Sequence, residues 1–169
     1  MSVTAGFHNL ADDPVDILNW RRLSERLTTS GQPSEDQLAA IGRLGITHIV
    51  NLGIHEHEKA LKDEQATVLS LGMTYIHLPV DFAAPTESDF DRFCRIMGAV
   101  QNDRVHVHCI RNARVTAFLY RYRRDVSKED PQQAAAVMET VWRPGGAWAA
   151  FIGHQDDTAL QHRYAGHDY

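Results

Sequence analysis

Short apolar runs rich in β-branched residues alternate with amphipathic segments along this chain, and no other feature limits the possible folds as strongly. The runs "ITHIVNL" at 46–52, "MTYIHLPV" at 73–80 and "RVHVHC" at 104–109 have the length and composition of β-strands. Strands that alternate with helices in this way build parallel sheets with helices on both faces. We therefore expect an α/β fold of three layers, with a mostly parallel central sheet flanked by helices.

Helix start and stop signals fall between these strands. The first helix is expected to begin after Ser34, whose spacing to Gln37 is that of a capping box, and to end at Gly45. A second helix is expected over roughly 57–71, with Gly72 as its stop. Further helices are predicted after the caps Thr86 and Asp130, over 114–124 and within 145–153.

Composition agrees with one globular domain of 169 residues, since 43% of them are hydrophobic and 23% charged. The formal net charge of −5 argues against nucleic acid or an anionic membrane as a partner, so an anion site must be built locally. The first 20 residues lack the apolar core of a signal peptide, and no run approaches the ~18 apolar residues of a membrane span. We expect a cytoplasmic protein.

Neither the cysteines nor the histidines predict a metal site or a disulfide. Cys94 and Cys109 are too few for a disulfide framework and lack zinc-ligand spacing, so both are expected to be free thiols. His55 and His57 in "HEH" are two positions apart and are expected in a solvated loop, because a metal site needs three or four convergent ligands. No metal and no cofactor are expected.

Cys109 differs from Cys94 in its surroundings. It ends a strand that is expected to be central, and ligands of open α/β sheets bind beyond the carboxyl ends of such strands. The turn that follows leads into a helix, whose first N–H groups stabilise a thiolate or a bound phosphate. Arg111 and Arg114 add guanidinium groups suited to phosphate oxygens. Cys94 lies inside an amphipathic helix without such a basic turn, which indicates a packing role.

The stretch "VHVHCIRNARVT" at 105–116 resembles the signature loop of the cysteine-dependent protein tyrosine and dual-specificity phosphatases. It is more similar still to a bacterial phosphatase-like branch that includes a domain of beta-lactamase hydrolase-like proteins. The stretches "WRRLSERLTTSGQPSEDQLAAIG", "TYIHLPVDFAAPT" and "WRPGGAWAAFI" share the similarity. The resemblance implies an N-terminal extension over 1–19, a phosphatase-like domain over 20–153 and a C-terminal tail over 154–169. It implies a protein tyrosine phosphatase-like fold and hydrolysis of a phosphorylated substrate without a cofactor.

The resemblance also assigns roles within the cysteine loop, residues 109–114. Cys109 would be the nucleophile that forms a thiophosphate intermediate, and Arg114 would hold the phosphate. His108 would form a hydrogen bond within the loop and help to hold the thiolate, unless it only satisfies buried backbone. Thr116 would assist the breakdown of the intermediate, although a residue at a helix start can lack a chemical role. The phosphate-binding residues would be Cys109, Ile110, Arg111, Asn112, Ala113 and Arg114.

A general acid is expected on a separate loop well before the cysteine. Asp81 fits by resemblance, because it follows the predicted strand "TYIHLPV" and lies between Pro79 and Pro85, which suit a shaped loop. The alternative for Asp81 is an ordinary turn aspartate at a strand end. Asp89 is the rival acid, although it is expected in the first turn of the next helix.

The loop departs from the family pattern in length. Four residues separate Cys109 from Arg114 where the family has five, so Val115 stands in the usual place of the arginine. Asn112 replaces the usual glycine, and asparagine is the next residue most tolerant of a left-handed backbone. Two alternatives follow. One is a rhodanese-like sulfurtransferase that works through a Cys109 persulfide, and the other is a phosphate-binding module without turnover.

Overall fold

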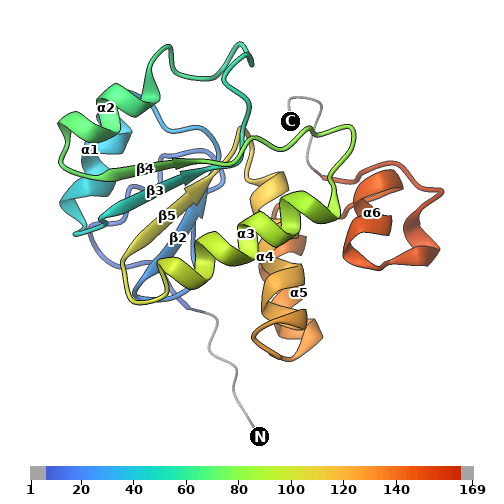
Figure 1. Cartoon of the computed structure of the whole chain (residues 1–169). Helices are drawn as coiled ribbons and strands as arrows, with labels where there is room; N and C mark the ends of the chain where they lie inside the picture. Colours follow the sequence, from blue (N-terminus) through green and yellow to red (C-terminus); the bar gives the residue numbers. More distant parts are fainter. Residues whose placement is uncertain (1–6, 165–169) are drawn as a thin grey trace, which may run out of the picture.

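The computed structural model describes residues 7–164, and the strands found there form one sheet with helices on both faces (Figure 1). The strands are β1 (Arg21–Arg22), β2 (Leu27–Ser30), β3 (His48–Asn51), β4 (Thr74–His77) and β5 (Val105–His108). The helices are α1 (Glu35–Arg43), α2 (Glu64–Ser70), α3 (Glu87–Ala99), α4 (Ala113–Asp125), α5 (Pro131–Glu139) and α6 (Gly146–Ile152), with a short 3-10 helix at Gln155–Asp157.

The strand order is β1-β2-β5-β3-β4, which places β5 in the centre as expected. Strands β2, β5, β3 and β4 are parallel, and only β1 runs antiparallel to its neighbour. The predicted α/β fold with a mostly parallel sheet is therefore confirmed. Within residues 7–164, no helix has the length and apolar character needed to cross a membrane.

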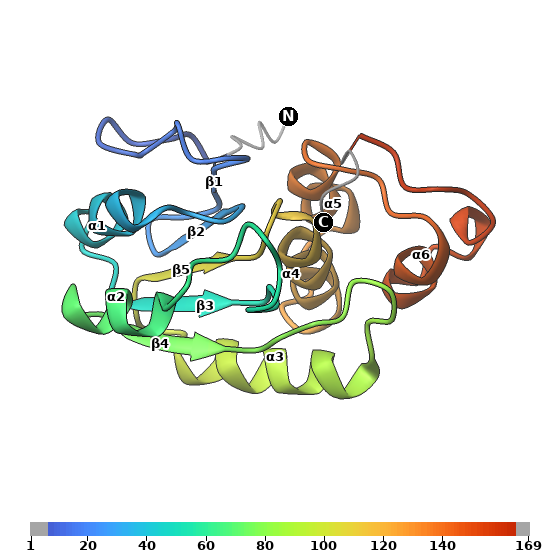
Figure 2. The ribbon, with the colours of Figure 1, turned by 90° about the horizontal axis from the view of Figure 1, so that it is seen from above.

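Each face of the sheet has its own hydrophobic core. Helices α1 and α2 cover one face, while α3 and α4 cover the other, with α5 and α6 packed against α4 (Figure 2). All four residues of β5 are buried because both faces are covered. A strand in this position gives the residue that follows it a fixed place at the carboxyl edge of the sheet.

Most of the predicted helix caps are confirmed. Ser34 and Gln37 form the expected capping box at α1, and Gly45 beyond that helix has a φ of +88°. Asp130 accepts hydrogen bonds from the first turn of α5, which has Pro131 as its first residue. These ends follow from the local sequence, since the capping side chain satisfies N–H groups that the helix itself cannot.

The prediction of a helix over 57–71 was wrong at its start, because α2 begins only at Glu64. The ring of His57 accepts a hydrogen bond from the backbone N–H of Lys59, and the Asp63 carboxylate accepts one from that of Ala66. The His57 contact stabilises a turn before the helix, and the Asp63 contact is the N-cap from which α2 begins.

Strand β2 was not predicted because its sequence, "LTTS", is polar although three of its residues are buried. Its neighbour β5 explains this composition. The His106 ring lies 2.8 Å from the Thr28 hydroxyl through Nδ1 and 2.8 Å from the Ser30 hydroxyl through Nε2. Buried polar groups are stable when they are paired in this way.

The segments next to the expected domain boundaries pack onto the domain. Asp13 forms a buried ion pair with Arg22 on β1, and Ile17 belongs to the core beneath α1. In the expected C-terminal tail, His162 accepts a hydrogen bond from the backbone N–H of Gly145, and its ring packs against Trp142.

Candidate active site

Cys109 lies directly after the central strand and is fully buried. The chain then turns into α4 through Asn112, which has the left-handed φ of 69° that its position in the loop suggested. The Asn112 side chain donates hydrogen bonds to the carbonyl of Asn19 and to the hydroxyl of Thr29. The Asn19 side chain donates in turn to the carbonyl of Arg111. The segment before β1 therefore holds the cysteine loop in shape.

The backbone of the cysteine loop presents a set of N–H donors. The N–H groups of Ile110, Arg111 and Asn112 donate to no acceptor among residues 7–164, and the same is true of Ala113 at the start of α4. Consecutive N–H groups at the start of a helix, together with the helix dipole, form a binding site for an anion. The loop is thus suited to bind a phosphate beside the Cys109 sulfur.

The loops after β2 and β3 lie against the cysteine loop, and the first of them approaches it closely at a glycine. A Cβ atom on Gly31 would lie 2.6 Å from the carbonyl oxygen of Ile110, which is shorter than real contacts allow. A Cβ atom on Gly53 would lie 3.4 Å from the Ile110 side chain and 3.6 Å from Cα of Cys109. The loops after β2 and β3 therefore form the walls on either side of Cys109.

Arg114 lies in the first turn of α4 and is 2% exposed. Its guanidinium carbon lies 5.2 Å from the centre of the Phe82 ring. Arg111 is partly exposed, and its Nε atom is buried without an acceptor among the described residues. The two arginines therefore differ in setting, one enclosed at the helix start and the other nearer to solvent.

Asp81 is exposed in the loop after β4, and its Oδ1 atom accepts a hydrogen bond from the N–H of Ala83. The next residue anchors this loop, because Trp148 donates to the carbonyl of Phe82 at 2.7 Å. The Phe82 ring also packs against Trp142. The contact between Phe82 and Arg114 then links the loop of the proposed acid to the cysteine loop.

Asp89, the rival acid, has a structural role in α3. It forms a capping box with Thr86, and its carboxylate accepts a hydrogen bond from Arg92. Thr116 lies in α4, where its hydroxyl is within 2.8 Å of the Asn112 carbonyl and accepts a hydrogen bond from the indole of Trp142. A catalytic role for Thr116 stays a prediction.

Sequence reasoning missed Glu64, which pairs with His108 in the interior. Nε2 of His108 lies 2.7 Å from Oε2 of Glu64, and the two side chains are 0% and 1% exposed. Gln32 donates to the other carboxylate oxygen at 2.6 Å. Nδ1 of His108 lies 3.1 Å from the carbonyl oxygen of Cys109. A glutamate in the first turn of a helix normally faces solvent, so the sequence held no signal for this contact.

The environment of Glu64 favours its ionised form. Burial by itself raises the pKa of this carboxyl, but the charge and hydrogen bond of His108 and the hydrogen bond from Gln32 outweigh it. The pKa of Glu64 therefore lies below its ordinary value.

Stacked histidines lie beside this pair at the carboxyl ends of β3 and β4. The rings of His55 and His77 are parallel, with centres 3.8 Å apart. Nε2 of His77 donates to the carbonyl of Gly53, and burial lowers the pKa of His77. Among residues 7–164, no group of three or more His, Cys, Asp or Glu side chains could hold a metal ion.

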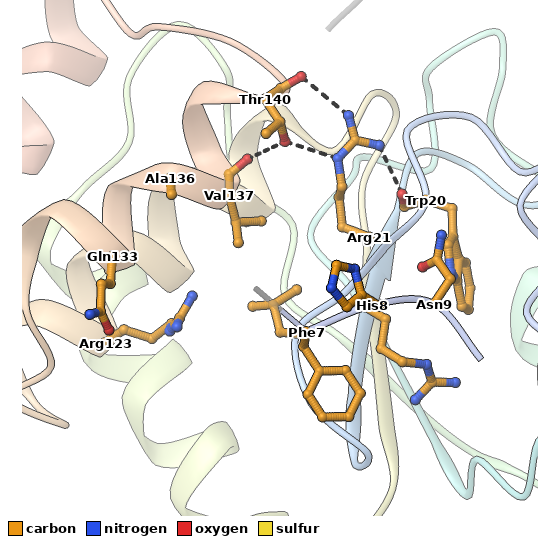
Figure 3. Close-up of a pocket in the computed structure, with 12 residues that line it drawn as sticks. Phe7, His8, Asn9, Trp20, Arg21, Arg123, Gln133, Ala136, Val137 and Thr140 are labelled. Carbon is orange, nitrogen blue, oxygen red and sulfur yellow. Dashed lines mark hydrogen bonds between the residues drawn. The ribbon is translucent and has the colours of Figure 1, made fainter. Parts of the chain in front are cut away.

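A cavity of about 650 Å³ lies between the segment before β1, β1 itself and α5 (Figure 3). It includes no residue of the cysteine loop. Its arginines are occupied: Arg21 donates to the hydroxyl and the carbonyl of Thr140, Arg22 pairs with Asp13, and Arg123 pairs with Glu129. The anion-binding geometry therefore lies in the cysteine loop and not in this cavity.

The fold and the loop define a class. A buried cysteine ends a central parallel strand, and a turn of free N–H donors with an arginine at the helix start follows it, as in the protein tyrosine phosphatase-like α/β domains. Residues 12–149 match the family described as "DSP-PTPase phosphatase fused to NAD+ Kinase". The chain belongs to this family, so the phosphatase-like assignment made from the loop is confirmed.

Relatives and solved structures agree with this assignment. A "Beta-lactamase hydrolase-like protein" of Xylella fastidiosa is 33% identical over 90 residues, which cover 52% of this chain and 21% of the relative. The chain thus matches about a fifth of the length of the curated relatives.

Three solved structures have the same fold. The "Putative phosphatase (DUF442)" of Shewanella putrefaciens CN-32 has a TM-score of 0.75 and 26% identity, covering 84% of this chain and 93% of its own. TpbA of P. aeruginosa, solved in complex with pTyr, has a TM-score of 0.63 and 20% identity, covering 93% and 86%. The core catalytic domain of the PP-IP phosphatase SIW14 of S. cerevisiae has a TM-score of 0.66 and 14% identity, covering 83% and 87%.

Proposed function

We propose that this phosphatase-like domain hydrolyses phosphate monoesters through a thiophosphate on Cys109. The observation that carries the proposal is the position of Cys109 in the turn from β5 into α4, where N–H donors have no acceptor among the described residues. Such donors stabilise the charge on the transferring phosphoryl group, and stabilisation of this kind is most of what phosphoryl transfer requires.

In the first step, the Cys109 thiolate attacks phosphorus and the ester P–O bond breaks. Asp81, in its protonated form, gives its proton to the leaving oxygen, which departs as an alcohol or a phenol. In the second step, water attacks the thiophosphate, Asp81 takes a proton from it, and the S–P bond breaks to give inorganic phosphate and the thiolate. Asp81 thus acts as the general acid in the first step and as the general base in the second.

Three further residues support these steps. Arg114 would bind the equatorial oxygens of the phosphoryl group with its planar guanidinium, while Arg111 would meet an acidic group on the substrate. Thr116 would assist the second step, with a hydroxyl that turns from the Asn112 carbonyl toward the sulfur of Cys109. The substrate is proposed only as a phosphorylated molecule, because the fold neighbours named above act on different ones.

The test is hydrolysis of p-nitrophenyl phosphate by the purified chain and its variants. Cys109→Ser should abolish turnover and keep phosphate binding, whereas Cys94→Ser should leave both unchanged. Cys94 is a matched control because burial raises the pKa of its thiol and it lies inside α3. Hydrolysis that persists in Cys109→Ser would refute the mechanism. Phosphate binding without turnover by the wild type would favour a binding module, and thiosulfate-to-cyanide sulfur transfer would favour a rhodanese-like activity.

A further inference from the structure

We propose that Glu64 is a positioning residue that keeps His108 as a buried imidazolium behind Cys109, and that this arrangement favours the thiolate. The inference rests on the proposed function in that it treats Cys109 as the reactive group. Glu64 does not reach the reacting atoms and acts through His108.

The contacts of the His108 ring require both nitrogens to donate. Nδ1 faces the carbonyl oxygen of Cys109 at 3.1 Å, and a carbonyl oxygen can only accept. Nε2 faces Oε2 of Glu64 at 2.7 Å, and an ionised carboxylate can also only accept. A neutral imidazole carries one N–H and satisfies one of these acceptors, whereas an imidazolium satisfies both.

Glu64 can serve as the anion of this pair because each of its carboxylate oxygens has a donor. Gln32 donates to Oε1 at 2.6 Å, and His108 donates to Oε2. The pair is almost completely buried, so water screens the attraction little. A buried ion pair is stable only when its geometry is good and its remaining hydrogen-bonding groups are satisfied, as they are here.

Three other titratable groups around the pair favour their neutral forms. On β5, Nε2 of His106 donates to the Ser30 hydroxyl, which itself donates to the Gly31 carbonyl, so Nδ1 accepts from Thr28. Burial also lowers the pKa of His106 well below its ordinary value. On β4, burial lowers the pKa of His77 and burial with the charge of Glu64 raises that of Tyr75.

His55, an exposed residue in the loop after β3, contacts His77 and Tyr75. Its ring stacks on His77, and its Nε2 atom lies 2.9 Å from the hydroxyl of Tyr75. His55 also contributes to lowering the pKa of Glu64, though less than His108 and Gln32 do. Of the titratable groups of this region, His108 is the one in contact with the backbone of Cys109.

The pair is neutral overall, but its positive end is next to Cys109. The imidazolium donates to the carbonyl of the nucleophile itself through Nδ1, while Glu64 contacts the opposite ring nitrogen. Replacing Glu64 by Gln keeps the shape and lets the amide donate to Nε2, so His108 becomes neutral. A positive charge near a thiol lowers the pH at which the thiolate forms. The variant should therefore form the thiolate at higher pH.

The test is the rate of alkylation of Cys109 by iodoacetamide as a function of pH, in a Cys94→Ser background that removes the other thiol. Glu64→Gln should move the midpoint of this profile upward by about one pH unit. His108→Gln should do the same, and the double variant should shift no further. Glu56→Gln removes an exposed carboxylate of the same chain region and should leave the midpoint unchanged.

A purely structural role for Glu64 predicts a different result. In that case Glu64→Gln would lower the yield of folded protein or the maximal rate of alkylation and leave the midpoint of the pH profile in place. An unmoved midpoint in folded Glu64→Gln overturns the proposal. If Glu64→Gln alone does not fold, the double variant with His108→Gln carries the test, since it holds no buried charge. In that variant too, an unmoved midpoint overturns the proposal.

Spectra of protein labelled with ¹⁵N in histidine give a second readout. At pH 7 both ring nitrogens of His108 should carry protons in the wild type, and only Nδ1 should do so in Glu64→Gln. A singly protonated ring in the wild type would overturn the proposal. The alkylation of Cys109 does not depend on hydrolysis. If the variants show the expected midpoint shifts but the wild type never cleaves a phosphate ester, the proposed function is rejected and this inference is supported.

Discussion

The guanidinium of Arg114 lies over the ring of Phe82, with 5.2 Å between Cζ and the ring centre. The two residues come from the cysteine loop and from the loop of the proposed acid, and the contact fixes these loops relative to one another. Positioning of this kind matters because a displacement of about 1 Å at a reacting group can cost on the order of a hundredfold in rate.

Replacing Phe82 by Ala should lower kcat/KM for p-nitrophenyl phosphate by roughly tenfold or more, because both Arg114 and the Asp81 loop lose a packing partner. Phe82→Tyr keeps the ring and is the matched control. It should retain most of the activity. Steady-state kinetics at constant pH make the comparison, and equal kcat/KM values in the two variants would show that the ring does not couple the loops.

The two loop arginines should differ in their effect on anion binding. Arg114→Lys keeps the charge but loses the planar group, so phosphate affinity should fall about tenfold or more, as expected for the ~1.5–3 kcal/mol of a charged hydrogen bond. Arg111→Lys should mainly change substrate preference. Calorimetric titration of phosphate into both variants, on a Cys109→Ser background, measures binding without chemistry. Loss of binding only in Arg111→Lys would assign the phosphate-holding role to Arg111.

Asp81→Asn should slow hydrolysis of alkyl phosphates, which have poor leaving groups, much more than hydrolysis of activated aryl phosphates. The reason is that a good leaving group needs no proton as it departs. Asp89→Asn is the control, because Asp89 is the N3 residue of the capping box of α3, so its replacement should lower stability without this selectivity. Rates on both substrate types decide the matter, and an equal loss on both in Asp81→Asn would remove Asp81 from the mechanism.

Gly31→Ala should destabilise the protein by roughly 1–3 kcal/mol, since the added Cβ would lie 2.6 Å from the backbone oxygen of Ile110. Gly98→Ala is a matched control within α3, where no atom lies within 4 Å of an added Cβ. That change should stabilise the protein by roughly 0.5–1 kcal/mol. Urea unfolding measures the free energy of unfolding of both variants. A neutral Gly31→Ala would mean that the loop after β2 can move away from the cysteine loop at little cost.

Much of the fold could be predicted because its signals are local. The capping box at Ser34, the proline at the start of α5 and the β-branched run of β5 each depend on neighbours in sequence, and each is present in the structure. The left-handed backbone at Asn112 also follows from the residue type in its turn.

The features that the sequence did not predict depend on contacts between residues far apart in the chain. Strand β2 is polar and becomes a strand because His106, far along the chain, pairs with its hydroxyls. Glu64 is buried because His108 lies opposite, which no local pattern of α2 indicates. The resemblance to phosphatases proposed Cys109 and Asp81 as site residues, whereas the contact of Glu64 with His108 is visible only in the structure.

The most direct measurement is to trap the intermediate. A phosphate ester with a good leaving group, mixed with Asp81→Asn and quenched in acid within a turnover, should leave a phosphoryl group on the peptide that contains Cys109, because the variant lacks the base that activates water. Tandem mass spectrometry locates the modified residue, with Cys109→Ser as the blank. Phosphorylation of Cys109 that appears and decays at the rate of turnover is the predicted result. Turnover with an unmodified Cys109, or with the phosphoryl group on another residue, would contradict the mechanism.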